Sequence, residues 1–249
     1  MTENSMMRKK GPLVWLDMDQ KELDDAYDQS VYAPNQPLLA KRRAAASKAA
    51  IERLGAPARI AYGPTEIEKL DIYKTSRPNA PINVYIHGGA WRNGQAKDFA
   101  FPAEVFINAG AHLSGCALVT DWQKDFALPS DTIKGGLLIS GMYDLKPVRL
   151  SKRSEYVKFT DEIEQALSSQ RHLDKLNAPI IVAYGTQETP EFQRQSREFA
   201  AAVKAVGKPV ELIVGEAFNH FEMQETLGNP YGIAGRAGLK LMNLTTTLR

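Results

Sequence analysis

The second half of the chain alternates strand-like and helix-like segments, and this alternation limits the fold more than any other feature. Short apolar runs typical of buried strands lie at Gly135–Ser140, Pro179–Tyr184 and Val210–Val214. Helical patterns lie at Thr160–Ser168, Glu191–Val206 and Tyr231–Leu244. Alternating segments of this kind predict an α/β fold with a mostly parallel sheet flanked by helices.

The first half predicts a helix, a hairpin and one more strand. An Ala-rich helix is expected at Leu38–Leu54, ending at Gly55. Two short strands, Arg59–Tyr62 and Glu68–Tyr73, flank a Gly-Pro turn and favour an antiparallel hairpin. Further segments are predicted as a buried parallel strand at Ile82–Ile86 and a helix at Asp98–Gly110.

Composition narrows the functional classes. The 249 residues are 43% hydrophobic and carry a net charge of only +2, which fits one domain over residues 1–249 and argues against nucleic acid or a membrane as a partner. The single cysteine, Cys116, excludes a disulfide framework and a multi-thiolate metal site. Without a recognisable signal peptide, we expect a cytoplasmic protein.

The segment His87-Gly88-Gly89-Ala90-Trp91 follows the predicted Ile82–Ile86 strand. Paired glycines allow backbone N–H groups to face a point where negative charge develops during acyl transfer. A tight Gly-Gly turn is the simpler alternative. We interpret Gly88, Gly89 and Ala90 as a candidate oxyanion hole, with His87 and Trp91 as candidate substrate-binding residues.

Two further residues fit acid–base chemistry. His220 follows the last predicted strand, where a loop presents side chains at the carboxyl end of a sheet, so it is a candidate general base. Glu188 follows the strand before it and is the candidate acid that orients this imidazole. Glu191 is explained by a helix N-terminus alone, and Asp144 by loop structure, one strand too early.

Together these segments resemble the α/β-hydrolase superfamily, and more narrowly its kynurenine formamidase-like (arylformamidase-like) esterases of the hormone-sensitive-lipase type. The resemblance includes the segments His87–Trp91, Ser140–Leu145, Glu188–Ser196 and Asn219–Glu222. It implies hydrolysis of small esters or aryl formamides through a serine acyl-enzyme, with no cofactor and no metal. It assigns the acid to Glu188, the base to His220 and the oxyanion donors to Gly88, Gly89 and Ala90.

The nucleophile departs from this pattern. The family carries it in a G-x-S-x-G turn, and no such pentapeptide occurs in the chain. The stretch between Gly89 and Gly135 is also less than half of the roughly 90 to 100 residues that the fold needs there. We therefore expect an internal deletion near residues 108–113 that removes two central strands, one helix and the serine.

Three residues near this junction are relevant to the missing nucleophile. Asn108 falls at the nucleophile position, and an amide cannot accept an acyl group in this mechanism. Neither Ser114 nor Cys116 has the glycines two residues before and after it that let the strained turn form. Ser114 is better explained as a small helix-packing residue, and Cys116 as a core thiol.

Three functions remain open from the sequence. The chain is an inactive or impaired hydrolase, a working hydrolase whose sequence here omits a segment, or a non-catalytic ligand-binding or scaffold protein on a hydrolase-derived fold. The expected partner is a small-molecule ester or formamide. Sheet edges opened by the deletion also favour a homodimer.

Overall fold

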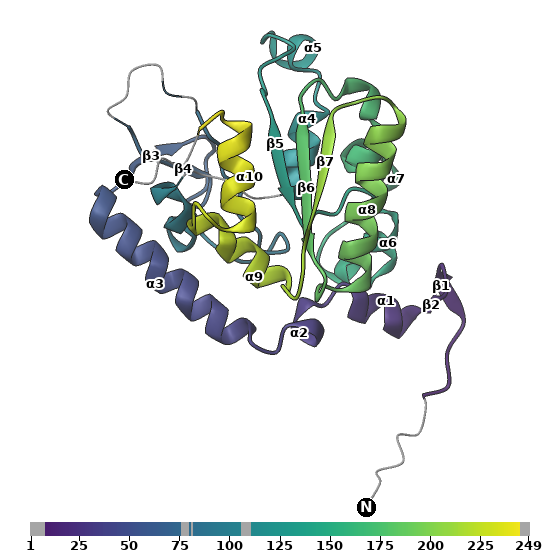
Figure 1. The fold of residues 1–249 in the computed structure, drawn as a ribbon. Helices are drawn as coiled ribbons and strands as arrows, with labels where there is room; N and C mark the ends of the chain where they lie inside the picture. Colours follow the sequence, from purple (N-terminus) through teal and green to yellow (C-terminus); the bar gives the residue numbers. More distant parts are fainter. Residues whose placement is uncertain (1–7, 76–79, 81, 106–110, 245–249) are drawn as a thin grey trace, which may run out of the picture.

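The centre of the molecule is a parallel sheet of three strands (Figure 1). The computed structural model describes residues 8–75, 80, 82–105 and 111–244. The strand order is β5 (Gly136–Ile139), β6 (Ile180–Gly185), β7 (Val210–Gly215), paired in register along their lengths. All three strands predicted in the second half of the chain are confirmed, and so is the parallel sheet.

Helices cover both faces of this sheet, which explains why β5 and β6 are apolar at every position. Leu138 and Val182 point to one face, where they pack with Leu118 of α4 and Phe199 of α8. Leu137, Ile139, Ile181 and Ala183 point to the other face, against residues of α9 and α10. The alternation follows from the two-residue period of a strand.

The predicted helices of the second half are confirmed with small shifts at their ends. They are α7 (Asp161–Leu167), α8 (Pro190–Ala205) and α10 (Ile233–Leu241). The other helices of the second half are α4 (Ala111–Leu118), α5 (Trp122–Phe126), α6 (Lys146–Leu150) and α9 (His220–Glu225). Short 3-10 turns lie at η3 (Lys152–Glu155), η4 (Ser169–Arg171), η5 (Leu173–Lys175) and η6 (Thr226–Gly228).

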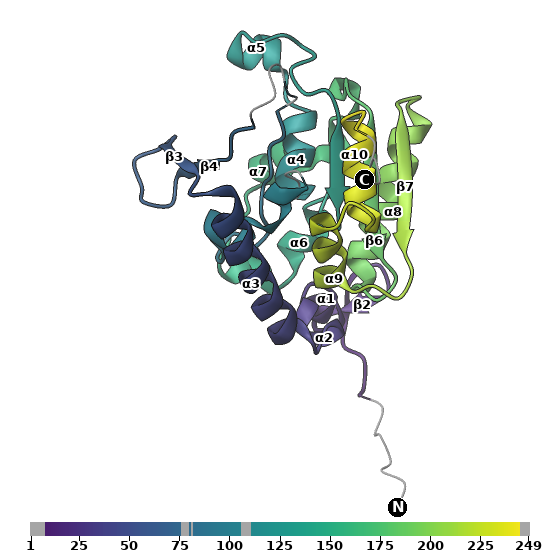
Figure 2. The same ribbon diagram turned by 60° about the vertical axis from the view of Figure 1, so that its left-hand side comes forward.

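The first half also contains the predicted helix and hairpin. Helix α3 (Gln36–Leu54) ends at Gly55, whose positive φ of 82° is costly for other residues. Strands β3 (Ala58–Ala61) and β4 (Lys69–Ile72) pair antiparallel and extend away from the rest of the molecule (Figure 2). The chain begins with β1 (Leu13–Trp15), β2 (Met18–Asp19), α1 (Gln20–Ala26) and α2 (Gln29–Tyr32).

The prediction of a buried parallel strand at Ile82–Ile86 is wrong. Residues 82–88 have no regular secondary structure, Ile82 is 92% exposed and Val84 is 62% exposed. Tyr85, in the middle of the segment, packs against the core beside the sheet. A strand needs a neighbour to accept its hydrogen bonds, and no strand among the described residues pairs with this segment. An apolar run indicates strand propensity but not the presence of a partner.

The prediction of one helix at Asp98–Gly110 is also wrong over its described part. Two 3-10 turns replace it, η1 (Ala96–Phe99) and η2 (Phe101–Glu104), and residues 106–110 lie outside the described residues. Pro102 lacks a backbone N–H and opens the second turn, so the chain does not continue as one helix. Phe99 and Phe101 are both buried in the core beside β5.

Among the described residues, no helix combines the length and the apolar character that crossing a bilayer demands.

Candidate active site

Two loops at the carboxyl ends of β6 and β7 form the centre of the candidate site. They are joined by backbone hydrogen bonds, from Thr186 N–H to the Gly215 carbonyl at 2.9 Å and from Gln187 N–H to the Phe218 carbonyl at 3.0 Å. A Cβ on Gly185 would lie 2.1 Å from the Phe218 carbonyl oxygen, so only glycine permits this approach. The two loops thereby place Glu188 next to His220.

Glu188 is almost fully buried and is surrounded by donors. Its Oε1 accepts hydrogen bonds from the Gly185 N–H at 2.7 Å and the Ser140 hydroxyl at 2.5 Å, and its Oε2 lies 2.9 Å from His220 Nδ1. A buried carboxylate requires such partners, because leaving water without them is costly. The carboxylate is therefore fixed in the orientation that meets the imidazole.

His220 is the first residue of α9, and the start of this helix is well capped. The Asn219 side chain accepts from the N–H groups of Phe221 and Glu222, and the Glu222 carboxylate accepts from the Asn219 N–H. Asn35, which precedes α3, hydrogen bonds to both Asn219 and Glu222. The general-base candidate therefore sits on a rigid turn, tied to a helix from the first half of the chain.

The His220 ring lies between two aromatic side chains. Phe192 and Phe221 meet it edge-on, with ring centroids 5.1 and 5.3 Å away. Because the Glu188 carboxylate only accepts, Nδ1 carries the proton, and the Nε2 lone pair is left to accept from the Gln224 amide, 3.2 Å away. This is the tautomer that a general base needs.

The oxyanion-hole candidate lies on the Nε2 side of this ring. An ideal Cβ on Gly88 would be 3.9 Å from Gln224 Nε2, the atom that contacts the imidazole. Gly89 has a φ of 141°, and a Cβ there would lie 1.7 Å from the Asn93 carbonyl oxygen. Ala90 has a φ of 52°, in the left-handed region that alanine rarely adopts. Such strain is concentrated at functional sites.

The flanking residues of this segment pack against aromatic rings. His87 stacks on Phe99 with centroids 4.8 Å apart, and its Nδ1 lies 2.7 Å from the Gly88 carbonyl oxygen. Trp91 is 42% exposed and meets Phe159 edge-on at 6.0 Å. His87 therefore packs the Gly88–Ala90 loop against Phe99, while Trp91 presents part of its ring to solvent.

Among the described residues, the group at His220 Nε2 is the Gln224 amide and not a hydroxyl or thiol. Asn108 lies outside the described residues. Ser114 and Cys116 are on α4, and the Cys116 thiol donates to the Leu167 carbonyl at 3.4 Å. Burial raises the pKa of Cys116 to about 11, so its thiolate is scarce at neutral pH.

The two competing carboxylates are engaged elsewhere. Glu191, in the first turn of α8, is fully buried and pairs with Arg194 at 2.6 and 2.8 Å. Asp144 contacts Arg171 at 3.1 Å and accepts from the Lys146 N–H. Both therefore have the structural roles expected of them, and the structure brings Glu188, not these residues, to His220.

Sequence reasoning missed three residues of the site, Ser140, Phe192 and Gln224. Gln224 was within reach of such reasoning, because residues four apart on a helix share a face, and it lies four residues after His220. Ser140 follows β5 in the chain, but only the sheet order shows that this end of β5 adjoins the Glu188 loop.

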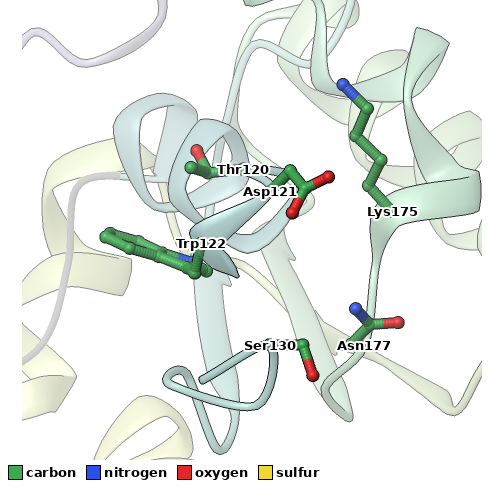
Figure 3. Close-up of a pocket in the computed structure, with 6 residues that line it drawn as sticks. All are labelled: Thr120, Asp121, Trp122, Ser130, Lys175 and Asn177. Carbon is green, nitrogen blue, oxygen red and sulfur yellow. The ribbon is translucent and has the colours of Figure 1, made fainter. Parts of the chain in front are cut away.

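A separate pocket, shown in Figure 3, lies among the segments that lead into β5 and β6. Its lining residues are Thr120, Asp121, Trp122, Ser130, Lys175 and Asn177. These residues precede β5 and β6 or follow α4, whereas Glu188 and His220 lie at the carboxyl ends of the strands. Its volume of about 100 Å³ is small for an organic ligand. The described residues also contain no cluster of three or more His, Cys, Asp or Glu side chains suited to a metal ion.

The chain is similar in sequence to known kynurenine formamidases. No family model matches the chain. It is 27% identical to kynurenine formamidase from Danio rerio and 26% identical to kynurenine formamidase from Salmo salar, in both cases over 86% of this chain and 93% of the relative. The Danio rerio alignment extends over 274 positions while using about 214 of the 249 residues, so about 60 of its positions have no residue of this chain.

Solved structures share the fold. A protein assigned as a thioesterase from Silicibacter sp. TM1040 aligns with a TM-score of 0.73 at 20% identity, covering 86% of this chain and 98% of that one. A hormone-sensitive lipase from a metagenome library aligns with a TM-score of 0.53 at 14% identity, covering 87% and 97%.

The parallel sheet, the helices on its two faces and these similarities define the class: the chain has the α/β-hydrolase fold. Within this class, its sequence is similar to kynurenine formamidases. Its function by homology is that of a hydrolase.

Proposed function

We propose that this chain is a carboxylic-ester or aryl-formamide hydrolase by descent that retains its acid, base and oxyanion loop but has lost its nucleophile. The observation that carries the proposal is the surroundings of His220, with Glu188 on Nδ1 and the Gln224 amide on Nε2. In a serine hydrolase, the Nε2 atom accepts the proton of the nucleophile. Among the described residues a carboxamide takes that place, so the base has no side-chain nucleophile there to activate.

The length of the chain supports the same proposal. The relatives have about 60 aligned positions without a counterpart here, and the sequence lacks the G-x-S-x-G turn. A block loss of the central strands and the serine accounts for both facts. It also accounts for Ile82–Ile86, which has a strand sequence but no partner strand among the described residues.

The remaining parts support a low level of chemistry. A Glu-His pair polarises water weakly, and an oxyanion loop stabilises the charge that develops on a carbonyl oxygen. Related enzymes without their nucleophile keep roughly 10³- to 10⁴-fold catalysis over water. The expected reaction is direct attack of water on an activated ester. His220 Nε2 accepts a proton from the water as its oxygen bonds to the carbonyl carbon, and it returns that proton to the leaving alcohol as the carbon–oxygen bond of the ester breaks.

Chemical rescue tests the proposal. A chromogenic aryl ester is followed with and without hydroxylamine, a small nucleophile that supplies the missing attacking group. We expect hydroxylamine to accelerate ester cleavage by the wild type, and His220→Ala and Glu188→Gln to abolish this acceleration. His172→Ala is the matched control, because the His172 ring contacts the Gln165 carbonyl and not Glu188.

Labelling with a fluorophosphonate checks the missing nucleophile directly. We expect no covalent adduct by intact mass spectrometry, and a mass of 27.6 kDa. A stoichiometric adduct on a serine or cysteine would show a working nucleophile. A heavier protein from the native source would show that a segment is missing from this sequence, and equal rescue in His220→Ala would remove the role of the base.

A non-catalytic ligand-binding or scaffold role is the second candidate. The aromatic rings of Phe192 and Phe221 remain next to His220, and Trp91 remains part-exposed, although the nucleophile is absent. Saturable binding of an aryl formamide by calorimetry, without turnover or hydroxylamine rescue, would favour this role.

We also propose that the chain forms a homodimer through the exposed β3–β4 hairpin and the unpaired edges of the sheet. Light scattering of the purified protein tests this proposal.

A further inference from the structure

We propose that Ser140 is a positioning residue that holds the Glu188–His220 pair in its working orientation. This inference rests on the proposed function, because it concerns the same acid and base. Ser140 is 4% exposed, and its hydroxyl donates to Glu188 Oε1 at 2.5 Å. The resulting chain of hydrogen bonds runs from Ser140 through Glu188 to His220.

The two carboxylate oxygens of Glu188 have different hydrogen-bond partners. Oε1 receives the Ser140 hydroxyl and the Gly185 N–H, while Oε2 receives the His220 Nδ1–H. A glutamate side chain has one more rotatable bond than an aspartate, so its carboxylate needs more fixing to present one oxygen to an imidazole. Gly185 holds Oε1 from one strand, and Ser140 holds it from the neighbouring strand.

The sheet places Ser140 for this contact. It follows the last residue of β5, and its N–H still donates to the Ala183 carbonyl of β6 at 2.8 Å. Its φ of 54° lies in the left-handed region, which residues with a side chain adopt at a cost. Glycine would accept this backbone more easily, but it has no hydroxyl to offer Glu188. The left-handed backbone of Ser140 and its hydroxyl are therefore both explained by the hydrogen bond to Glu188.

The geometry separates this role from that of a nucleophile. The Ser140 hydroxyl lies on the Glu188 side of the imidazole, and its proton is committed to Oε1. A nucleophile would have to lie at Nε2, across the ring, where Gln224 is found. Ser140 therefore acts through Glu188 and has no contact with a reacting carbonyl.

Proton NMR of the whole chain tests the proposal without requiring catalysis. An imidazole N–H that donates to a buried carboxylate gives a far-downfield resonance, assigned to His220 by its loss in His220→Ala and Glu188→Gln. We expect Ser140→Ala and Ser140→Gly to shift this resonance upfield. We also expect about a tenfold or greater rise in its exchange rate with water, the scale of losing a hydrogen bond to a charged group.

The two variants separate the hydroxyl from the backbone. Ala keeps the left-handed strain and Gly relieves it, so an effect shared by both belongs to the hydroxyl, and Ser140→Gly remains informative where Ser140→Ala folds poorly. Ser151→Ala is the matched control, because Ser151 is equally buried and its hydroxyl donates to the Val148 carbonyl, away from the site. It should leave the resonance unchanged.

The failures are distinguishable. If both Ser140 variants leave the resonance and its exchange rate as Ser151→Ala does, the positioning role is wrong while the acid–base pair stands. If the wild type has no downfield resonance that depends on both Glu188 and His220, the pair itself is absent, and the proposed function fails together with this inference.

Discussion

Two segments of similar sequence adopt different structures in this molecule. Residues 180–184 (IIVAY) form the middle strand of the sheet and are almost completely buried, whereas residues 82–86 (INVYI) form no strand and expose Ile82 to 92%. Both runs are short, apolar and rich in β-branched or aromatic residues. What differs is the neighbourhood, because β6 has a partner on each edge and Ile82–Ile86 has none among the described strands.

The comparison shows that burial on both faces and pairing on both edges make the strand, and that propensity alone does not. The candidate site belongs to the well-packed region. Glu188 and His220 follow β6 and β7, and hydrogen bonds between their loops do not involve the hairpin or residues 82–86. This explains how an ordered acid–base pair coexists with the exposed segment at residues 82–86.

Hydrogen exchange should show the largest contrast between the two segments. We expect the backbone amides of β6 to exchange at least about 10³-fold more slowly than those of residues 82–86, because they open only with the whole sheet. Mass spectrometry of peptides from both segments measures this ratio. Similar protection of the two would mean that residues 82–86 are paired in solution, either within the chain or with a second copy.

Truncating a core side chain should be the next largest effect. Leu138 of β5 is fully buried under the helices on one face of the sheet. Leu138→Ala should therefore lower the free energy of unfolding by about 3 kcal/mol. Ile82→Ala truncates a similar side chain that is exposed to solvent, and it should change the free energy of unfolding by less than about 0.5 kcal/mol. Urea denaturation of both variants provides the values, and a large loss for Ile82→Ala would reveal a buried contact there.

Alkylation of Cys116 tests how closely α4, which carries this residue, packs on β5 at the edge of the sheet. Burial raises the pKa of this thiol from 9.0 to about 11, so the reactive thiolate is about a hundredfold scarcer at pH 8 than in an ordinary cysteine. We expect iodoacetamide to react slowly at pH 8 and faster as the pH approaches 11. A fast reaction at pH 8, matching urea-unfolded protein, would indicate that α4 is not packed as described.

The smallest effect is expected at the start of the chain. Asp19 caps α1, and the N–H groups of Gly11 and Glu22, with Arg8, hold its pKa at about 2, below the ordinary 3.8. Because the folded pKa is depressed, this carboxylate contributes stability above about pH 4 and loses it as the pH falls through about 2.

Asp19→Asn is the appropriate comparison, because asparagine also caps helices but does not titrate there. The melting temperature of the wild type should fall more than that of Asp19→Asn between about pH 4 and pH 2. Parallel curves for the two proteins would mean that α1 contributes nothing to stability through this charge.

Several elements were predictable because their signals are local. The strands β5, β6 and β7, the helices α3, α7, α8 and α10 and the β3–β4 hairpin all carry clear periodic or turn patterns. Glu188 and His220 were predictable because each follows a strand, and parallel strands present their following loops at one edge. The two wrong predictions, at Ile82–Ile86 and Asp98–Gly110, both depend on neighbours that a local pattern does not report.

The sequence by itself determined the class of fold, the acid and base candidates and the absence of a G-x-S-x-G turn, because each of these is written in a short stretch of residues. Only the tertiary structure decided that Ser140 meets Glu188, that Gln224 rather than a hydroxyl faces His220, and that Ile82–Ile86 is no strand. These contacts join residues through the order of strands and the packing of loops. They depend on what surrounds a side chain in space, which a one-dimensional pattern cannot specify.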